Sequence, residues 1–144
     1  MTDLNTSLDQ AFEQYRDDLG KAARKLKPTD GFLGFGHGLK DAHCHEAFDQ
    51  KIGEIVCGTT PDTVDKQEAA AAVNRLLLNA DECNWPDCAI WMLRAVQRHA
   101  LPLIPRLAAE DAQMILKEYE KRYPRYDRLP VQREIIKALK KASG

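Results

Sequence analysis

The chain has 144 residues and a mass of 16.3 kDa, a length that favours one domain with one hydrophobic core. Hydrophobic residues make up 44% and charged residues 30% of the sequence, which argues against a disordered chain. No apolar stretch is long enough to span a bilayer, and the acidic, polar N-terminus does not resemble a signal peptide, so we expect a cytoplasmic protein without membrane contact.

The net charge is −1, but the charges are unevenly distributed along the chain. Residues 1–90 contain 16 acidic and 9 basic side chains, whereas residues 115–144 contain 9 basic and 4 acidic side chains. This asymmetry suits a protein that orients a charged partner. The alternative is that the two ends neutralise each other in the folded molecule.

Apolar residues recur at three- and four-residue intervals over residues 4–26, which predicts an amphipathic helix. Pro28 and Gly31 follow it and are expected to end it. Residues 31–38 then contain four glycines, and each glycine costs about 1 kcal/mol relative to alanine inside a helix. We therefore expect a loop over residues 31–38.

A second helix is predicted over residues 41–57, with Asp41 as its cap and Gly58 after its end. Thr60 and Pro61 then have the pattern of a cap followed by proline in the first helical position, which predicts a third helix from there to about residue 80.

A fourth helix is predicted to begin after Trp85 and Pro86, and it is apolar nearly all round, so we expect it to form the centre of the core. Pro102 and Pro105 are expected to break or kink it. A fifth helix over residues 109–123 and a sixth from Pro130 complete the chain. No segment alternates with a period of two, so the prediction for residues 1–144 is a single all-α domain of five to seven amphipathic helices with short connections marked by glycine and proline.

Three of the four histidines lie in a segment that also contains carboxylates: His37, Asp41, His43, His45 and Asp49. Imidazole and carboxylate groups are ligands for Zn²⁺ or Fe²⁺, and Asp41, His45 and Asp49 follow one another at four-residue intervals on the predicted helix. The segment is a candidate metal site of a hydrolase or sensor. The alternative is local packing and ion pairing, because His43 and His45 are two residues apart and point to different sides of a helix.

The remaining nucleophiles do not form a catalytic set. Cys83 and Cys88 are separated by four residues but have no second matching pair, and Cys44 and Cys57 form none, so we expect free thiols, with metal ligands as the alternative. The two serines lie near the ends of the sequence, where a nucleophile would be poorly held.

Residues 117–128 interleave tyrosine with basic residues, the side chains enriched at binding hot spots. The candidate partner-binding residues are Lys121, Arg122, Tyr123, Arg125, Tyr126 and Arg128. A protein partner is favoured over nucleic acid, because the chain has a pI of about 6.4 and acidic residues interrupt the segment. The sequence therefore predicts a non-enzymatic helical module, such as an adaptor, a regulator or an immunity-type inhibitor, with no cofactor; the metal-binding reading stays open beside it.

Overall fold

The computed structural model of the protein describes residues 3–24, 35–59, 63–78 and 85–144, except for the side chains of 23–24, 35–41 and 87–88. These residues form six α-helices and three short 3₁₀ helices, with no strand among them, so the all-α prediction is confirmed. The α-helices are α1 (Leu4–Arg24), α2 (Phe35–Cys57), α3 (Lys66–Leu77), α4 (Asp87–Ala95), α5 (Ala109–Arg122) and α6 (Pro130–Ala142). The 3₁₀ helices are η3 (Val96–Ala100), η4 (Ile104–Arg106) and η5 (Arg125–Asp127).

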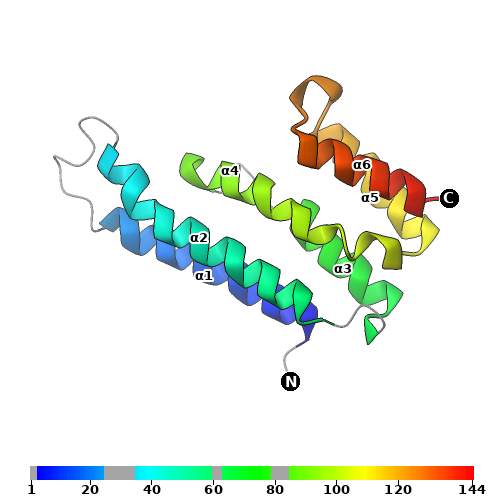
Figure 1. Ribbon diagram of the computed structural model, residues 1–144, viewed down its shortest axis with the longest axis horizontal. Helices are drawn as coiled ribbons and strands as arrows, with labels where there is room; N and C mark the ends of the chain where they lie inside the picture. Colours follow the sequence, from blue (N-terminus) through cyan, green and yellow to red (C-terminus); the bar gives the residue numbers. More distant parts are fainter. Residues whose placement is uncertain (1–2, 25–34, 60–62, 79–84) are drawn as a thin grey trace.

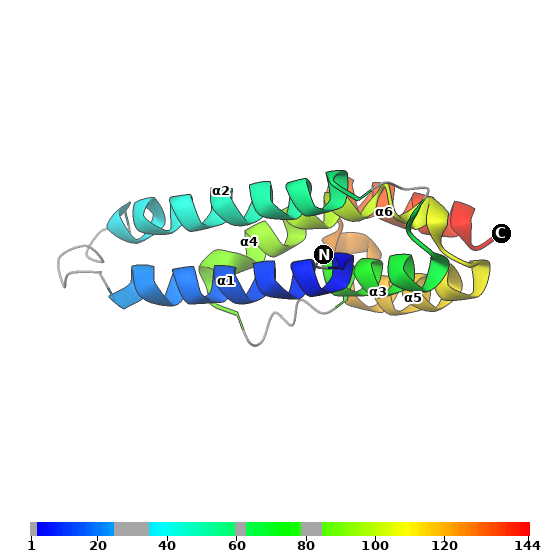
Figure 2. The same ribbon diagram turned by 90° about the horizontal axis from the view of Figure 1, so that it is seen from below.

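The helices stand in three pairs, side by side (Figure 1). One outer pair is α1 with α2, the other is α5 with α6, and the middle pair is α3 with the continuous stretch α4–η3. Turning the molecule shows two layers (Figure 2): α1, α3 and α5 lie in one, and α2 and α6 lie in the other. The contacts agree, since α3 touches α1 and α5 while η3 touches α2 and α6. The middle pair therefore joins the two outer pairs.

The outer helices bury the faces that their sequence pattern predicts. Leu8, Tyr15 and Leu19 of α1 are buried, and Ile135 and Leu139 of α6 are buried with no exposed surface. Burying one such apolar side chain contributes about 2 kcal/mol, so packing and not local propensity stabilises these helices. None of the helices formed by the described residues is long and apolar enough to cross a bilayer.

Helix α2 starts earlier than expected, at Phe35, so the prediction of a loop is wrong for residues 35–38, while residues 31–34 lie outside the described part. Gly36 and Gly38 are unfavourable in a helix, but adding a residue to an existing helix gains a hydrogen bond without the cost of nucleation. The stability of a helix of 23 residues outweighs the free-energy cost of these two glycines.

Helix α3 starts later than expected, at Lys66, and the predicted start at Thr60 and Pro61 lies outside the described residues. Its N-cap is Asp65, whose carboxylate accepts a hydrogen bond of 2.7 Å from the amide of Glu68. An acidic cap with glutamate three positions later is a known start signal, so this boundary was readable from the sequence.

The fourth predicted helix is divided into α4 and η3. Its central position is as expected, but the residues at the centre belong to η3, where Val96, Gln97 and Ala100 are buried. The 3₁₀ geometry precedes Pro102, which has no amide hydrogen and clashes with a regular helical turn. Helix α4 is not covered all round, because Trp91 is 71% exposed.

Candidate functional site

The connection between α5 and α6 is a short turn that contains η5. Helix α5 ends at Arg122, Pro124 follows its C-cap residue Tyr123, and Pro130 occupies the first position of α6. Proline stops the first helix and is well suited to start the second. The sequence therefore sets both ends of this turn, which carries most of the predicted partner-binding residues.

Side chains from three elements hold the turn in place. Arg94 of α4 donates a hydrogen bond of 3.3 Å to the carboxylate of Asp127, and its guanidinium lies 5.3 Å from the ring centroid of Tyr123. Arg128 donates a 2.7 Å bond from Nε to the main-chain oxygen of Tyr123. The Gln97 amide donates a 2.9 Å bond to the Tyr123 hydroxyl. The turn is thus attached to α4, η3 and its own flanking residues.

Gln97 is the centre of a buried polar network beneath the turn. Its Oε1 accepts hydrogen bonds from the Tyr119 hydroxyl at 2.7 Å and from the Gln132 amide at 3.1 Å. Burial raises the pKa of the Tyr119 hydroxyl, so this group remains a donor. Gln132 in turn accepts a 3.0 Å bond from the amide of Leu129. This network joins η3, α5 and the start of α6.

The six predicted partner-binding residues separate into exposed and internal ones. Tyr126 is 92% exposed, and Arg122 and Arg125 are exposed with no ion pair to any described residue. Lys121 is exposed and pairs with Glu118 at 3.4 Å.

Of the other two, one is buried and one is partly buried. Tyr123, predicted for the surface, is only 5% exposed. It follows Tyr119 by four residues and so shares the buried face of α5. Arg128 keeps only 14% of its side chain exposed, and it lies 3.9 Å from Glu120. We define the turn surface as Lys121, Arg122, Arg125 and Tyr126.

The charges of the two ends of the chain stay apart. Among the described residues, the ion pairs of the basic end join Lys121 to Glu118, Arg128 to Glu120, and Asp127 to Arg94. None of these pairs connects residues 115–144 with an acidic residue of 1–90. Within the described residues, direct ion pairing between the ends therefore does not neutralise the asymmetry seen in the sequence.

The described side chains of the histidine segment point to different partners. His43 is exposed, His45 Nδ1 lies 2.5 Å from the Tyr15 hydroxyl, and Asp49 contacts residues of η3. The side chains of His37 and Asp41 lie outside the described part, although their backbone is helical. Among the described residues no group of three or more His, Cys, Asp or Glu is arranged to hold a metal.

Asp49 links α2 to η3. Its carboxylate accepts a 2.6 Å bond from Arg98 and lies 3.0 Å from His99 Nε2. Burial of Asp49 opposes ionisation, but the hydrogen bonds from Arg98 and His99 outweigh it and lower the pKa of Asp49. A Cβ on Gly53 would lie 3.1 Å from the His99 ring, so glycine permits this close approach. Sequence reasoning missed His99 because it lies 50 residues from its partner.

The described cysteines give no catalytic arrangement. Cys44 is partly buried and Cys57 is exposed, and neither forms a disulfide with a described residue. Cys83 and the side chain of Cys88 lie outside the described part.

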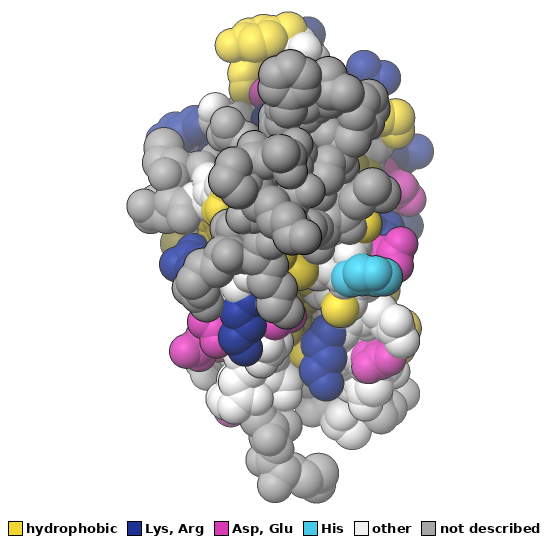
Figure 3. All heavy atoms as spheres, turned by 90° about the vertical axis from the view of Figure 1, so that its left-hand side faces the viewer, with side chains coloured by type: hydrophobic (Ala, Val, Ile, Leu, Met, Phe, Trp, Pro, Cys, Tyr) yellow, Lys and Arg dark blue, Asp and Glu magenta, His cyan; other side chains and the backbone are white. Residues whose placement is uncertain are grey.

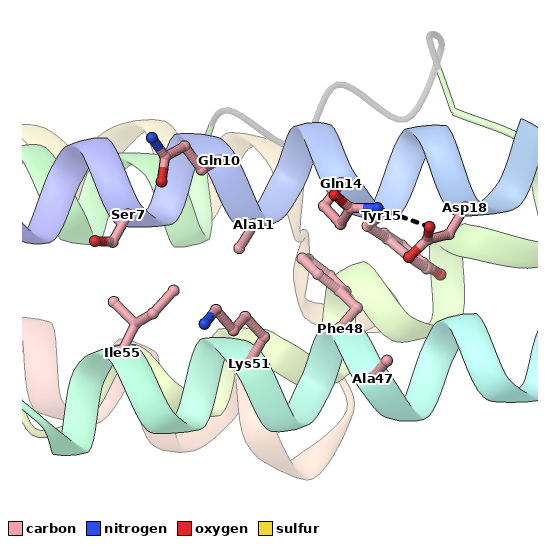
Figure 4. A pocket seen from close by; sticks show the side chains of 10 residues that line it. All are labelled: Ser7, Gln10, Ala11, Gln14, Tyr15, Asp18, Ala47, Phe48, Lys51 and Ile55. Atoms are coloured by element: carbon pink, nitrogen blue, oxygen red, sulfur yellow. Dashed lines mark hydrogen bonds between the residues drawn. The ribbon is translucent and has the colours of Figure 1, made fainter. Parts of the chain in front are cut away.

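A groove of about 520 Å³ runs along α1 and α2 (Figure 4). Its floor is formed by Ala11, Tyr15 and Phe48, and the last two rings are stacked with centroids 4.1 Å apart. Polar side chains form most of its rim: Ser7, Gln10, Gln14, Asp18 and Lys51. Gln14 donates a 2.8 Å hydrogen bond to Asp18. The groove has mixed polarity and brings together no nucleophile and base.

The chain matches no protein-family model, no curated protein and no solved structure. The site itself must therefore carry any functional argument.

Proposed function

We propose that this chain is a non-enzymatic helical module that binds another protein through the turn surface. The observation that carries the proposal is the 92% exposure of Tyr126 on a turn held from α4 and η3. Water solvates a large aromatic ring poorly, and tyrosine and arginine are enriched at the centres of protein interfaces.

The attachment of the turn supports the same proposal. A loop that must be ordered on binding loses conformational entropy, and each immobilised side chain costs about 1 kcal/mol. Here Arg128 already holds the main chain at Tyr123, and Arg94 and Gln97 hold the side chains of Asp127 and Tyr123, on either side of Tyr126. A partner would therefore meet a turn that is already held in place and that presents the exposed Tyr126 ring together with Arg122 and Arg125, and we expect this to take place in the cytoplasm.

Site-specific crosslinking in cells tests the proposal. A photoreactive phenylalanine analogue replaces Tyr126 in one variant and Trp91 in the control. Both positions hold exposed aromatic rings, 92% and 71% exposed, but Trp91 lies on α4, outside the turn surface. We expect a discrete crosslinked protein at position 126 that is absent at position 91, and that untagged wild-type chain competes away. Equal crosslinking at both positions, or none at position 126, would contradict the proposal.

A further inference from the structure

The solvent face of α6 carries a row of cations that the sequence analysis did not single out. Arg133, Lys137, Lys140 and Lys141 are all exposed, and their spacing of four, three and one residues places them on one side of the helix. We call these four residues the α6 stripe. The opposite side of α6 buries Ile135, Ile136 and Leu139 in the core, so the helix cannot rotate to hide the stripe.

Three carboxylates near these cations form no ion pair with a described residue: Glu134 on the same side of α6, and Glu110 and Asp111 at the start of α5. Of the four acidic residues in 115–144, Glu118, Glu120 and Asp127 already have ion-pair partners, and only Glu134 has none among the described residues. Seven basic side chains of the same segment form no ion pair with a described residue: Lys117, Arg122, Arg125, Arg133, Lys137, Lys140 and Lys141. Unpaired basic side chains therefore outnumber unpaired acidic ones among the described residues of α5, the turn and α6, on a chain of net charge −1.

Helix stability does not explain the whole stripe. Lys140 and Lys141 lie in the last turn of α6, where cations are favoured by the helix dipole. Arg133 lies near the opposite end, where the dipole disfavours a cation, and the first turn has no acidic residue to compensate. The four side chains share exposure and charge, not a common stabilising role in the fold.

We propose that the partner is a protein with an acidic segment that lies along the α6 stripe, with Tyr126 as the aromatic anchor at the near end. This inference rests on the proposed function and extends its surface. Helix α6 follows directly from the turn (Figure 1). Hydrophobic atoms project at the edge where the turn lies, with Lys and Arg atoms beside them (Figure 3). From Arg133 to Lys141 the helix rises about 12 Å, which matches about two turns of an acidic helix.

The chemistry favours a short acidic protein segment over the two other common polyanions. A membrane-surface helix needs an apolar face to insert, and the apolar face of α6 is buried in the core. A long nucleic acid would extend past the basic end toward the acidic residues of 1–90 and be repelled there. A short carboxylate-bearing segment contacts the basic end alone.

Binding of synthetic probes to the full chain tests the inference. The first probe is a fluorescein-labelled peptide of about twelve residues, roughly the length of the stripe with one turn added, in which Glu recurs at i, i+3, i+4 and i+7 and one Leu follows. The second carries Gln at the same positions. A labelled DNA duplex and vesicles containing phosphatidylserine are the other two. Fluorescence anisotropy measures the peptides and the DNA, and co-sedimentation measures the vesicles.

Charge reversal at three positions of the stripe provides the decisive comparison. The stripe variant carries Lys137→Glu, Lys140→Glu and Lys141→Glu. The matched control carries Lys21→Glu, Lys51→Glu and Lys66→Glu, three exposed lysines of α1, α2 and α3, and so has the same net charge. Far-UV circular dichroism and thermal unfolding establish that both variants are folded.

We expect the Glu peptide to bind and the Gln peptide to bind at least about tenfold more weakly, because attraction to unpaired cations is lost. The stripe variant should weaken binding of the Glu peptide at least about tenfold, and the control less than about twofold. Tighter binding of DNA or vesicles, equal loss in both variants, or no binding of the Glu peptide would overturn the inference. If crosslinking at position 126 persists in the stripe variant, the proposed function stands and the inference about the acidic segment does not.

Discussion

The buried network around Gln97 allows a sharp test of how the turn is anchored. In the wild-type protein the Tyr119 hydroxyl donates to Gln97 Oε1 at 2.7 Å, and the Gln132 amide donates to the same oxygen at 3.1 Å. Replacing Tyr119→Phe removes one donor, while Gln97 keeps the bond from Gln132. We expect the free energy of unfolding to fall by about 1 kcal/mol, the usual net contribution of one hydrogen bond.

Replacing Gln97→Leu has a larger effect, because it removes three hydrogen bonds at once. The Tyr119 hydroxyl and the Gln132 amide are then buried without their acceptor, and each unsatisfied group costs about 1–3 kcal/mol. Burial of the apolar leucine side chain offsets part of this loss in the free energy of unfolding. The expected net loss is about 3 kcal/mol in the free energy of unfolding.

The two substitutions together distinguish this explanation from simple loss of packing. In the Gln97→Leu background the Tyr119 hydroxyl has lost its acceptor and keeps only its interaction with Gln132, so removing it with Tyr119→Phe should cost much less stability than in the wild type. Urea unfolding followed by far-UV circular dichroism measures all four proteins. Additive losses in the double variant would refute the reasoning, because they would mean that the hydroxyl is satisfied without Gln97.

Three further outcomes follow from the structure. Asp49→Asn should lower stability by about 1 kcal/mol at neutral pH. Because the folded-state pKa of Asp49 is lowered from the ordinary value of 3.8, the difference should persist down to about that pH and be lost only as the pH falls further, through the folded-state pKa; urea unfolding across the pH range measures this. Trp91→Phe should remove the emission component that acrylamide quenches readily and leave that of Trp85, since Trp91 is 71% exposed and Trp85 only 7%; a residual signal that is still strongly quenched would contradict the burial of Trp85. Adding a chelator to untagged protein should not change its thermal unfolding midpoint, because the described candidate ligands His45 and Asp49 have partners of their own. A midpoint that falls in the wild type but not in His45→Ala would restore the metal hypothesis.

The fold was predictable wherever a single face of a helix is buried. The apolar spacing in α1, α5 and α6 marks that face directly. The errors fell at residues 35–38 and at the start of α3, where local signals compete with longer-range effects. Glycine propensity was outweighed by helix extension at Gly36, and the cap at Asp65 was overlooked in favour of the Thr60 and Pro61 pattern.

The candidate site was predictable in charge but not in detail. The excess of basic residues in 115–144 is evident from the sequence. Whether a cation has an ion-pair partner depends on residues distant in the chain. Asp127, for example, pairs with Arg94 and not with a cation of its own segment. The spacing of Tyr123 from Tyr119 marks its burial, but its hydrogen bond to Gln97 spans 26 residues, and the pairing of Asp49 with His99 spans 50 residues. Such pairings leave no periodic signal.

The position of η3 between the two outer helix pairs has a kinetic consequence. Each outer pair is made from helices adjacent in the chain, so each can assemble through local contacts, which is the situation in which proteins fold fast. Among the described residues, both outer pairs make substantial contacts with the middle pair and few or none with each other. The two outer pairs should therefore behave as separate cooperative units in native-state hydrogen exchange. The amides of η3 should exchange only when the whole molecule opens, since they are released only when both neighbours separate.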